Sequence, residues 1–294
     1  MSELCDKVQY LDSLLDTERI ISGDKNSAKD IKSYFKINRL AYRRFHSREG
    51  FMHFRVSADG AFSDSDIHYQ PDAVSAYIPR YARVLELGSG QGANLRYLAE
   101  RRPDCFFCGV DLLPAPVKGP RNLRVIQRDY SDLSNFPDNA FDALYAIETL
   151  VYSSQKDRVF QEAYRVLKPG GAFIAHDYAL SRPYADLNPL TRKAVALISK
   201  GGAAALIESA EEWERLFTSN GFRREKVTDL SKETLPDLKR LQRKAERVLR
   251  RPNAAKAAFR VLPDQFVNNI ILGYLGYDSC REGVILYKEW VFRK

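Results

Sequence analysis

Apolar and polar positions follow a regular pattern from residue 83 onward. Short, mostly apolar runs bounded by turn residues predict buried strands, and apolar positions three and four apart between them predict helices. The expected strands cover residues 83–87, 106–110, 123–127, 141–147, 172–176, 222–230 and 283–292. Strands that alternate with helices form parallel crossovers. The pattern therefore predicts an α/β fold with a seven-stranded, mostly parallel sheet and helices on both faces.

Helical stretches precede the expected sheet and interrupt it. Residues 4–21 have helical spacing and end before Gly23, and Ser27 is expected to begin a second helix. Residues 46–67 are irregular and rich in aromatics, so we expect a loop or small hairpin over the site. Roughly 50 residues separate the last two strands, where a hairpin needs about 2–5, and such an insertion is typical of a substrate cap. The expected units are a helical N-terminal extension and lid at 1–77, a cofactor-binding core at 78–182, a helical insertion at 183–219, the last core strands at 220–230 and 281–294, and a helical substrate cap at 231–280.

The composition is that of a soluble globular protein, with 45% hydrophobic and 29% charged residues. No apolar run approaches the ~18 residues of a membrane span, and the first residues include acids where a signal peptide has bases. We therefore expect a cytoplasmic location. Cys105 and Cys108 have no second pair and lie at the start of an expected strand and within it, so structural thiols are favoured over a metal or redox site, and no metal site is expected.

The net charge of +8 is concentrated in residues 32–55 and 239–260. Apolar residues at helical spacing make the second stretch a basic amphipathic helix, expected at 235–251. Three interpretations remain open for it: a solvated face, a surface that meets anionic lipid or an anionic substrate, and a nucleic-acid surface. Because no RNA-binding module accompanies the charge, nucleic acid is not expected as a partner, and peripheral membrane contact through this helix is the alternative kept. The sequence does not indicate an oligomeric state.

A glycine turn follows the first expected strand. It reads Gly88-Ser89-Gly90-Gln91-Gly92, and the second strand ends on Asp111. Glycines allow a tight turn close to a ligand, and a carboxylate about 20 residues later can accept both hydrogen bonds of a ribose diol. The third glycine comes one residue earlier than in a dinucleotide site. Glu86 would repel a pyrophosphate but suits a cationic ligand with an α-amino group.

The run from Glu86 to Gly92 resembles the first motif of class I S-adenosylmethionine-dependent methyltransferases. A redox Rossmann protein is the alternative. The resemblance implies a Rossmann-like fold and S-adenosyl-L-methionine as the cofactor, with its ribose at Asp111, its adenine amine at Asp129 and Tyr130 beside the ring. The expected cofactor-binding residues are Glu86, Gly88, Ser89, Gly90, Gly92, Asn94, Asp111, Leu112, Asp129, Tyr130 and Ile147.

Three further segments resemble the sterol C-methyltransferases and the related prenyl-chain and tocopherol-type carbon methyltransferases. They are Phe136–Glu148, Tyr164–Gly171 and Asn188–Lys193, and the resemblance covers about residues 80–230. After Glu148 the chain reads Thr-Leu-Val-Tyr-Ser-Ser, where sterol enzymes usually have Ala-Thr-Cys-His-Ala-Pro. The resemblance therefore implies the type of reaction but does not identify the acceptor. We expect the acceptor to be a small apolar molecule, and one alternative is that it carries a phosphate group.

Methylation of an alkene carbon generates a carbocation that then loses a proton. A carboxylate at Glu148 can stabilise that cation and take the proton, and aromatic faces attract it. We therefore expect a C-methyltransferase of an isoprenoid, sterol-like or prenylated acceptor, in which the catalytic residues are Glu148, Tyr178 and Tyr152. The expected substrate-binding residues are Phe51, His53, Phe54, His176 and Asp177. An N- or O-methyltransferase of a small natural product, with His176 as a base, and an RNA methyltransferase are the alternatives.

Overall fold

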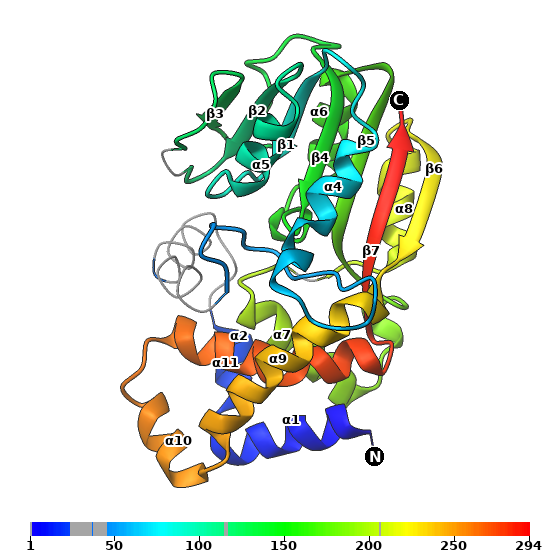
Figure 1. Cartoon of the computed structure of the whole chain (residues 1–294). Helices are drawn as coiled ribbons and strands as arrows, with labels where there is room; N and C mark the ends of the chain where they lie inside the picture. Colours follow the sequence, from blue (N-terminus) through cyan, green and yellow to red (C-terminus); the bar gives the residue numbers. More distant parts are fainter. Residues whose placement is uncertain (1, 24–36, 38–45, 115–116, 206) are drawn as a thin grey trace.

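One mixed sheet of seven strands organises the molecule, in the order β3-β2-β1-β4-β5-β7-β6. Its strands are β1 (Arg83–Leu87), β2 (Phe106–Asp111), β3 (Leu123–Gln127), β4 (Phe141–Ile147), β5 (Leu167–Leu180), β6 (Arg223–Asp229) and β7 (Ile285–Arg293). Strands β1 to β5 are parallel, whereas β7 runs antiparallel to both β5 and β6 (Figure 1). The predicted seven-stranded, mostly parallel sheet is confirmed. This computed structural model describes residues 2–23, 37, 46–114, 117–205 and 207–294.

Strand β5 is longer than the run of 172–176 that the sequence predicts. It extends to Leu180 because β7 pairs with it continuously from Ala172 to Leu180. The second half of β5 therefore lies inside the sheet, past the point where the sequence pattern ends the strand. This extension changes the position of the residues that follow Ala175.

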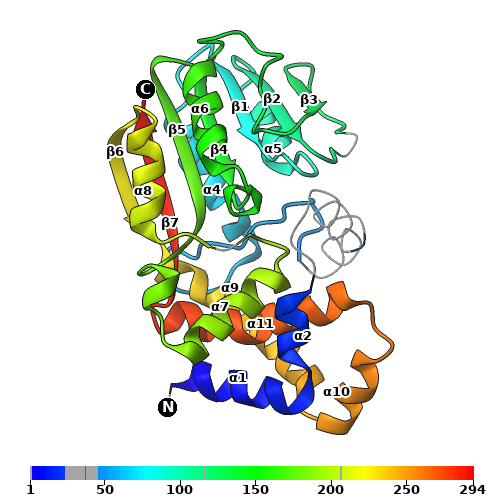
Figure 2. The ribbon, with the colours of Figure 1, turned by 180° about the vertical axis from the view of Figure 1, so that it is seen from behind.

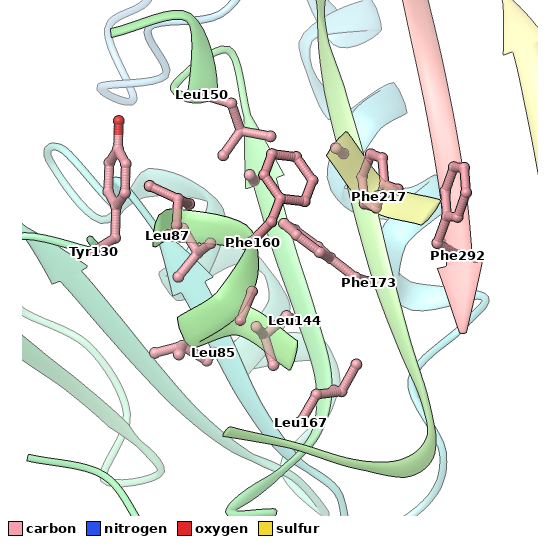
Figure 3. Close-up of a cluster of buried hydrophobic side chains, with 14 of the residues drawn as sticks. Leu85, Leu87, Tyr130, Leu144, Leu150, Phe160, Leu167, Phe173, Phe217 and Phe292 are labelled. Atoms are coloured by element: carbon pink, nitrogen blue, oxygen red, sulfur yellow. The ribbon is translucent and has the colours of Figure 1, made fainter. Parts of the chain in front are cut away.

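Helices cover both faces of the sheet. They are α4 (Tyr69–Ser75) and α5 (Ala93–Arg101) on one face, and α6 (Lys156–Val166) and α8 (Ala210–Ser219) on the other (Figures 1 and 2). The second face holds an aromatic core, in which Phe217 stacks on Phe292 with ring centroids 4.1 Å apart (Figure 3). Phe160 of α6 meets Phe217 edge to face at 4.6 Å. These buried pairs fix α6 and α8 on the sheet.

A separate helical layer lies beyond the carboxyl ends of the parallel strands (Figure 1). It contains α1 (Glu3–Leu14), α2 (Thr17–Ser22), α7 (Pro189–Gly201), α9 (Ser231–Leu249), α10 (Pro252–Phe259) and α11 (Asp264–Arg281). Helix α11 packs against both α9 and α7, and α1 packs against α7 and α11. The buried Lys7 Nζ donates to Asp278 Oδ2 at 2.6 Å, so an ion pair also joins α1 to α11.

The helix expected over residues 4–21 is divided into α1 and α2. Leu15 is extended, and the Asp16 side chain accepts a hydrogen bond from the Arg19 N–H, so Asp16 begins a new helix as an N-cap. The helix expected from Ser27 lies outside the described residues. Residues 46–63 are irregular and lead into a short 3₁₀-helix, η1 (Asp64–His68). No helix in the described part of the chain is long and apolar enough to cross a bilayer.

Candidate active site

A large cavity of about 1330 Å³ lies between the carboxyl edge of the sheet and the helical layer. Strand tips and the loops that follow them form one wall, and helices α7, α9 and α11 with the start of β7 form the other. Ligands bind at this edge in open α/β sheets because the loops there diverge from the strands. The cavity therefore occupies the place that the strand pattern predicts.

Most of the residues expected from the sequence line this cavity. The lining residues among them are Gly88, Ser89, Gly90, Asn94, Asp111, Leu112, Asp129, Tyr130, Ile147, Glu148, Tyr152, Tyr178, Phe51, His53 and Phe54. Glu86, Gly92, His176 and Asp177 do not line it, and their positions are described below. The topology thus brings together side chains that are spread over more than a hundred residues of sequence.

The glycine turn needs glycine at two of its positions for steric reasons. Gly88 and Gly92 have φ near +69°, and Gly90 has φ of +51°. A Cβ at Gly88 would lie 1.9 Å from Thr149 Oγ1, and a Cβ at Gly92 would lie 2.4 Å from Val117 Cγ2. The turn is therefore packed against the loop after β4 and the segment after β2, with its backbone close to the cavity.

Asp111 connects the tip of β2 to the glycine turn. Its Oδ2 accepts a hydrogen bond from the Gly90 N–H at 2.9 Å, and its Oδ1 accepts one from the Leu113 N–H at 2.7 Å. Each carboxylate oxygen can accept more than one hydrogen bond. The Asp111 side chain is thus fixed at the cavity wall with acceptor capacity left for a diol.

Glu86 lies behind Asn94 and is 1% exposed. Its Oε1 accepts from Asn94 Nδ2 at 3.1 Å, whereas Oε2 has no hydrogen-bond partner among the described residues. Burial raises the pKa of Glu86 to about 8. The side chains of Asn94 and Tyr145 oppose this increase, although the Tyr145 hydroxyl does not meet the geometry of a hydrogen bond with any described residue. The buried Ser89 hydroxyl also lacks a partner in this part of the structure. A cationic, hydrogen-bonding ligand would satisfy both groups, so these residues fit S-adenosylmethionine.

Asp129 and Tyr130 follow β3 at the same edge. Asp129 Oδ1 accepts from the N–H and the hydroxyl of Ser131 at 2.8 and 2.7 Å. The Tyr130 hydroxyl donates to the Thr149 carbonyl at 2.8 Å, and burial raises its pKa far above 10, so the group stays neutral. Both side chains are held in place beside the cavity, where a flat, polar ring can lie against them.

Glu148 directly follows β4 and has a left-handed backbone with φ of +48°. This conformation is rare for a residue with a side chain and is held here by a 2.7 Å hydrogen bond from the Glu148 N–H to the His176 carbonyl. Its carboxylate accepts from the Phe54 N–H through Oε1 and from the Tyr178 hydroxyl through Oε2, each at 2.8 Å. Strained residues of this kind concentrate at functional sites.

Burial raises the pKa of Glu148 to about 8. The Phe54 N–H and the hydroxyls of Tyr178 and Tyr287 favour the charged form and oppose this effect, and the charge of Asp177 adds to it. A carboxyl group with a pKa near neutrality can both take and return a proton during a reaction. Glu148 therefore has the properties of a general base.

Gln70 and Tyr287 belong to this site, although no sequence pattern indicated them. The fully buried Gln70 donates through Nε2 to the Phe54 carbonyl at 2.7 Å and to the Tyr287 hydroxyl at 3.0 Å. The ring of Tyr287 lies 5.3 Å from that of Tyr178, which meets Phe54 at 5.9 Å. Gln70 thus connects α4, residues 46–63 and β7 behind the Glu148 carboxylate.

His53 is buried and neutral. Its Nε2 lies 3.1 Å from Asn94 Oδ1 and its Nδ1 lies 3.1 Å from the Phe54 carbonyl oxygen. Burial lowers its pKa to about 4. Since Asn94 also contacts Glu86, His53 links residues 46–63 to the start of α5 and to β1.

His176 and Asp177 lie within β5 and away from the cavity lining. Asp177 Oδ2 accepts from the N–H groups of Leu150 and Val151 at 2.8 and 3.3 Å, so it caps the 3₁₀-helix η2 (Leu150–Tyr152). The fully buried His176 has its Nε2 3.2 Å from Glu289 Oε2 of β7. Both residues support the loop that carries Glu148 and Tyr152, and neither reaches the space available to a substrate.

The far wall of the cavity is apolar and comes mostly from α9 and α11. The sequence predicted a cap over 231–280 without naming these residues. They are Leu238, Leu241, Val248, Phe266, Ile270, Leu272, Gly273 and Gly276, with Lys244 and Arg247 as cations among them. No group of three or more potential metal ligands occurs among the described residues.

Comparison with known proteins agrees with this geometry. A family model described as "Methyltransferase domain" matches residues 85–175. Methyltransferase phqN of Penicillium fellutanum is 28% identical over 55% of this chain and 52% of its own length. The sterol 24-C-methyltransferase of Yarrowia lipolytica is 35% identical over 51% of this chain and 41% of its own length. The chain spans about half the length of the curated relatives it matches.

Solved structures share the fold over nearly the whole chain. A geranyl diphosphate methyltransferase, in complex with geranyl diphosphate and sinefungin, has a TM-score of 0.66 at 18% identity and covers 90% of this chain and 98% of its own. A mycolic acid cyclopropane synthase, complexed with S-adenosylhomocysteine, has a TM-score of 0.74 at 15% identity and covers 92% and 99%. The family match and the relatives agree with the resemblance: the chain contains a methyltransferase domain that is similar in sequence to sterol 24-C-methyltransferases and in fold to geranyl diphosphate C-methyltransferases.

Proposed function

We propose that this protein transfers a methyl group from S-adenosylmethionine to a carbon atom of an apolar isoprenoid, sterol-like or prenylated acceptor. The observation that carries the proposal is the position of the Glu148 carboxylate. It is held by the Phe54 N–H and the Tyr178 hydroxyl at the junction between the glycine-turn side of the cavity and its apolar side. A fixed carboxylate at such a junction suits a reaction that develops positive charge on the acceptor.

The bound cofactor would supply an electrophilic methyl group attached to a sulfonium sulfur. The π electrons of an acceptor double bond form the new carbon–carbon bond as the carbon–sulfur bond breaks, and the neighbouring acceptor carbon becomes cationic. The Glu148 carboxylate and the faces of Tyr178 and Tyr287 would stabilise that charge. Glu148 would then take a proton from an adjacent carbon, and the C–H electron pair closes a new double bond.

The size and lining of the cavity support an apolar acceptor. Its volume of about 1330 Å³ exceeds the ~300–1,000 Å³ of a typical ligand pocket, so a nucleoside cofactor and a hydrocarbon chain can lie end to end. The curated relatives include sterol methyltransferases, and solved structures of the same fold hold geranyl diphosphate. Lys244 and Arg247 at the lining would suit a phosphorylated head group.

Methylation of a nitrogen or oxygen atom is the alternative. Glu148, with its pKa of about 8, could take the proton of a hydroxyl or ammonium group. His176, the other base suggested by the sequence, lies outside the cavity lining, so the alternative rests on Glu148 as well. The two functions differ in the atom that receives the methyl group.

The decisive experiment is incubation with methyl-labelled S-adenosylmethionine and panels of prenyl diphosphates, sterols and quinols. Mass spectrometry identifies the methylated product, and NMR locates the label. We expect the label on a former alkene carbon, with the double bond shifted or restored. Label on nitrogen or oxygen would overturn the proposal in favour of the alternative.

A further inference from the structure

A cluster of exposed cations covers the end of the helical layer. It consists of Arg247, Arg250, Arg251, Lys256 and Arg260, here called the basic rim, from the end of α9, the start and body of α10 and the turn after it. All five are exposed, and none has an acidic partner in the part of the chain that the structure describes. Two acids lie in residues 243–264: Glu246, which contacts Lys7 at 3.3 Å, and Asp264 at the start of α11.

Apolar side chains are exposed within the same surface. Val261, in the turn between α10 and α11, is 82% exposed, which is the highest value of any large hydrophobic side chain among the described residues. Leu262 beside it is 37% exposed and Val248 of α9 is 39% exposed. Water-exposed apolar residues that are ringed by charge mark an interaction surface more often than a scattered apolar residue does.

The cavity opens at this surface. Arg247, Val248 and Leu262 are exposed and also line the cavity, so they form part of its mouth. Figure 1 shows α10 and the α10–α11 turn at the end of the helical layer that points away from β6 and α8. An apolar molecule that entered here would meet the hydrocarbon wall of α9 and α11 without crossing the polar cofactor side.

We propose that the basic rim and the Val261–Leu262 turn dock on an anionic lipid bilayer, from which an apolar molecule can pass into the cavity between Val248 and Leu262. Cations attract anionic head groups, and a short apolar turn inserts at the boundary of head groups and acyl chains. The entry route rests on the proposed methyl transfer to an apolar acceptor, whereas the docking does not.

The proposed docking surface differs from the membrane contact that the sequence left open for residues 235–251. The apolar face of α9 is covered, since Leu238, Ala245 and Leu249 are buried and α11 packs against this helix. Its exposed end and the α10–α11 turn therefore supply the surface. A nucleic acid would use the cations, but the exposure of Val261 and Leu262 is explained by lipid and not by phosphate contacts.

Vesicle sedimentation tests the docking without cofactor or acceptor. We expect the wild-type chain to bind vesicles of mixed phosphatidylcholine and phosphatidylglycerol and to leave pure phosphatidylcholine vesicles in solution. Arg250→Gln combined with Arg251→Gln should weaken binding roughly 25-fold, from about fivefold for each cation near an anionic surface. Val261→Ser should weaken it roughly tenfold through lost apolar burial.

The matched control is Arg215→Gln combined with Arg223→Gln. These exposed arginines lie on α8 and β6, on the sheet and far from α10, and their loss changes the net charge by the same amount. The control should bind anionic vesicles as the wild type does. Three outcomes would overturn the proposal. The two double variants could bind equally well, the wild type could bind neutral and anionic vesicles equally well, or the chain could bind RNA on a filter and not bind vesicles.

The entry route has a separate readout. With an acceptor carried in anionic vesicles, Val261→Ser should raise the apparent KM, while the rate with the same acceptor dispersed in detergent should not change. An equal effect in both formats would contradict entry from the bilayer. If the chain docks but transfers no methyl group, the proposed function fails and the docking stands.

Discussion

The Phe54 N–H donates a 2.8 Å hydrogen bond to Glu148 Oε1, although 94 residues separate the two in the chain. Glu148 ends a strand of the sheet, whereas Phe54 belongs to the irregular residues 46–63 that precede the sheet. Gln70 holds the Phe54 carbonyl from the other side. The charge and position of the proposed base therefore depend on how residues 46–63 pack on the sheet.

Replacement of Glu148 by glutamine should remove the proton acceptor while it keeps the shape of the side chain. We expect turnover to fall about 10²–10⁴-fold, the usual contribution of a general base. Cofactor affinity, measured by calorimetry, should change little. Glu100→Gln, at an exposed position of α5, is the control and should retain activity. A Glu148→Gln enzyme with normal turnover would remove the main support for carbocation chemistry.

The activity should depend on pH through the ionisation of Glu148. Because the deprotonated carboxylate is the proposed base and its pKa is about 8, kcat/KM should rise with pH and level off above about 8. Tyr178 donates to the charged form, so Tyr178→Phe should raise the pKa of Glu148 and move the profile to higher pH. A midpoint that stays in place in this variant would show that another group controls the profile.

Asp111→Ala should abolish most cofactor affinity. Two hydrogen bonds from a ribose diol to a carboxylate are worth about 1.5–3 kcal/mol each, so the dissociation constant should rise at least about 100-fold. Isothermal titration calorimetry with S-adenosylhomocysteine measures it. Asp157→Asn, on the exposed start of α6, is the control. Unchanged affinity in Asp111→Ala would exclude this residue from the nucleoside site.

Alanine substitutions at two glycines with positive φ distinguish the cost of backbone strain from the cost of steric overlap. Gly170 has φ of +78° and open space around an added Cβ, so Gly170→Ala should cost only the left-handed strain of about 1–2 kcal/mol. Gly88→Ala places its Cβ only 1.9 Å from Thr149 Oγ1, and this steric overlap should cost roughly 1–3 kcal/mol more. Urea unfolding measures both, and Thr149→Gly should recover the additional loss. An equal loss of unfolding free energy at the two positions would mean that the loop after β4 moves to accommodate the added methyl group without a cost.

The sequence predicted the sheet and the residues at its carboxyl edge well because both depend on local patterns. Each apolar run marks a strand, and the residue after it lies at the carboxyl edge, as for Asp111 and Glu148. His176 and Asp177 were expected at that edge for the same reason. They lie inside the sheet because β7 extends β5 by four residues beyond His176, to Leu180, and no local pattern records a pairing between distant strands.

The same limit explains why Gln70 and Tyr287 were not found. Tyr287 reaches Glu148 only because β7 runs antiparallel beside β5. Gln70 lies in a short helix whose sequence resembles any surface helix, and its importance comes from two contacts with distant residues. The apolar wall of α9 and α11 was expected as a cap, but the residues that face the cavity depend on how the two helices pack together.

Because β7 is the last strand in the sequence and lies between β5 and β6, the sheet can be completed only late in synthesis. Among the described residues, strand β6 pairs with β7 alone, and the segment between these two strands holds α9, α10 and α11. While a ribosome makes that segment, the edge of β5 and both edges of β6 stay open, and unpaired edges invite association between chains. A nascent chain of this protein should therefore need chaperone protection over residues 167–284, and pauses in translation there should lower the yield of folded protein.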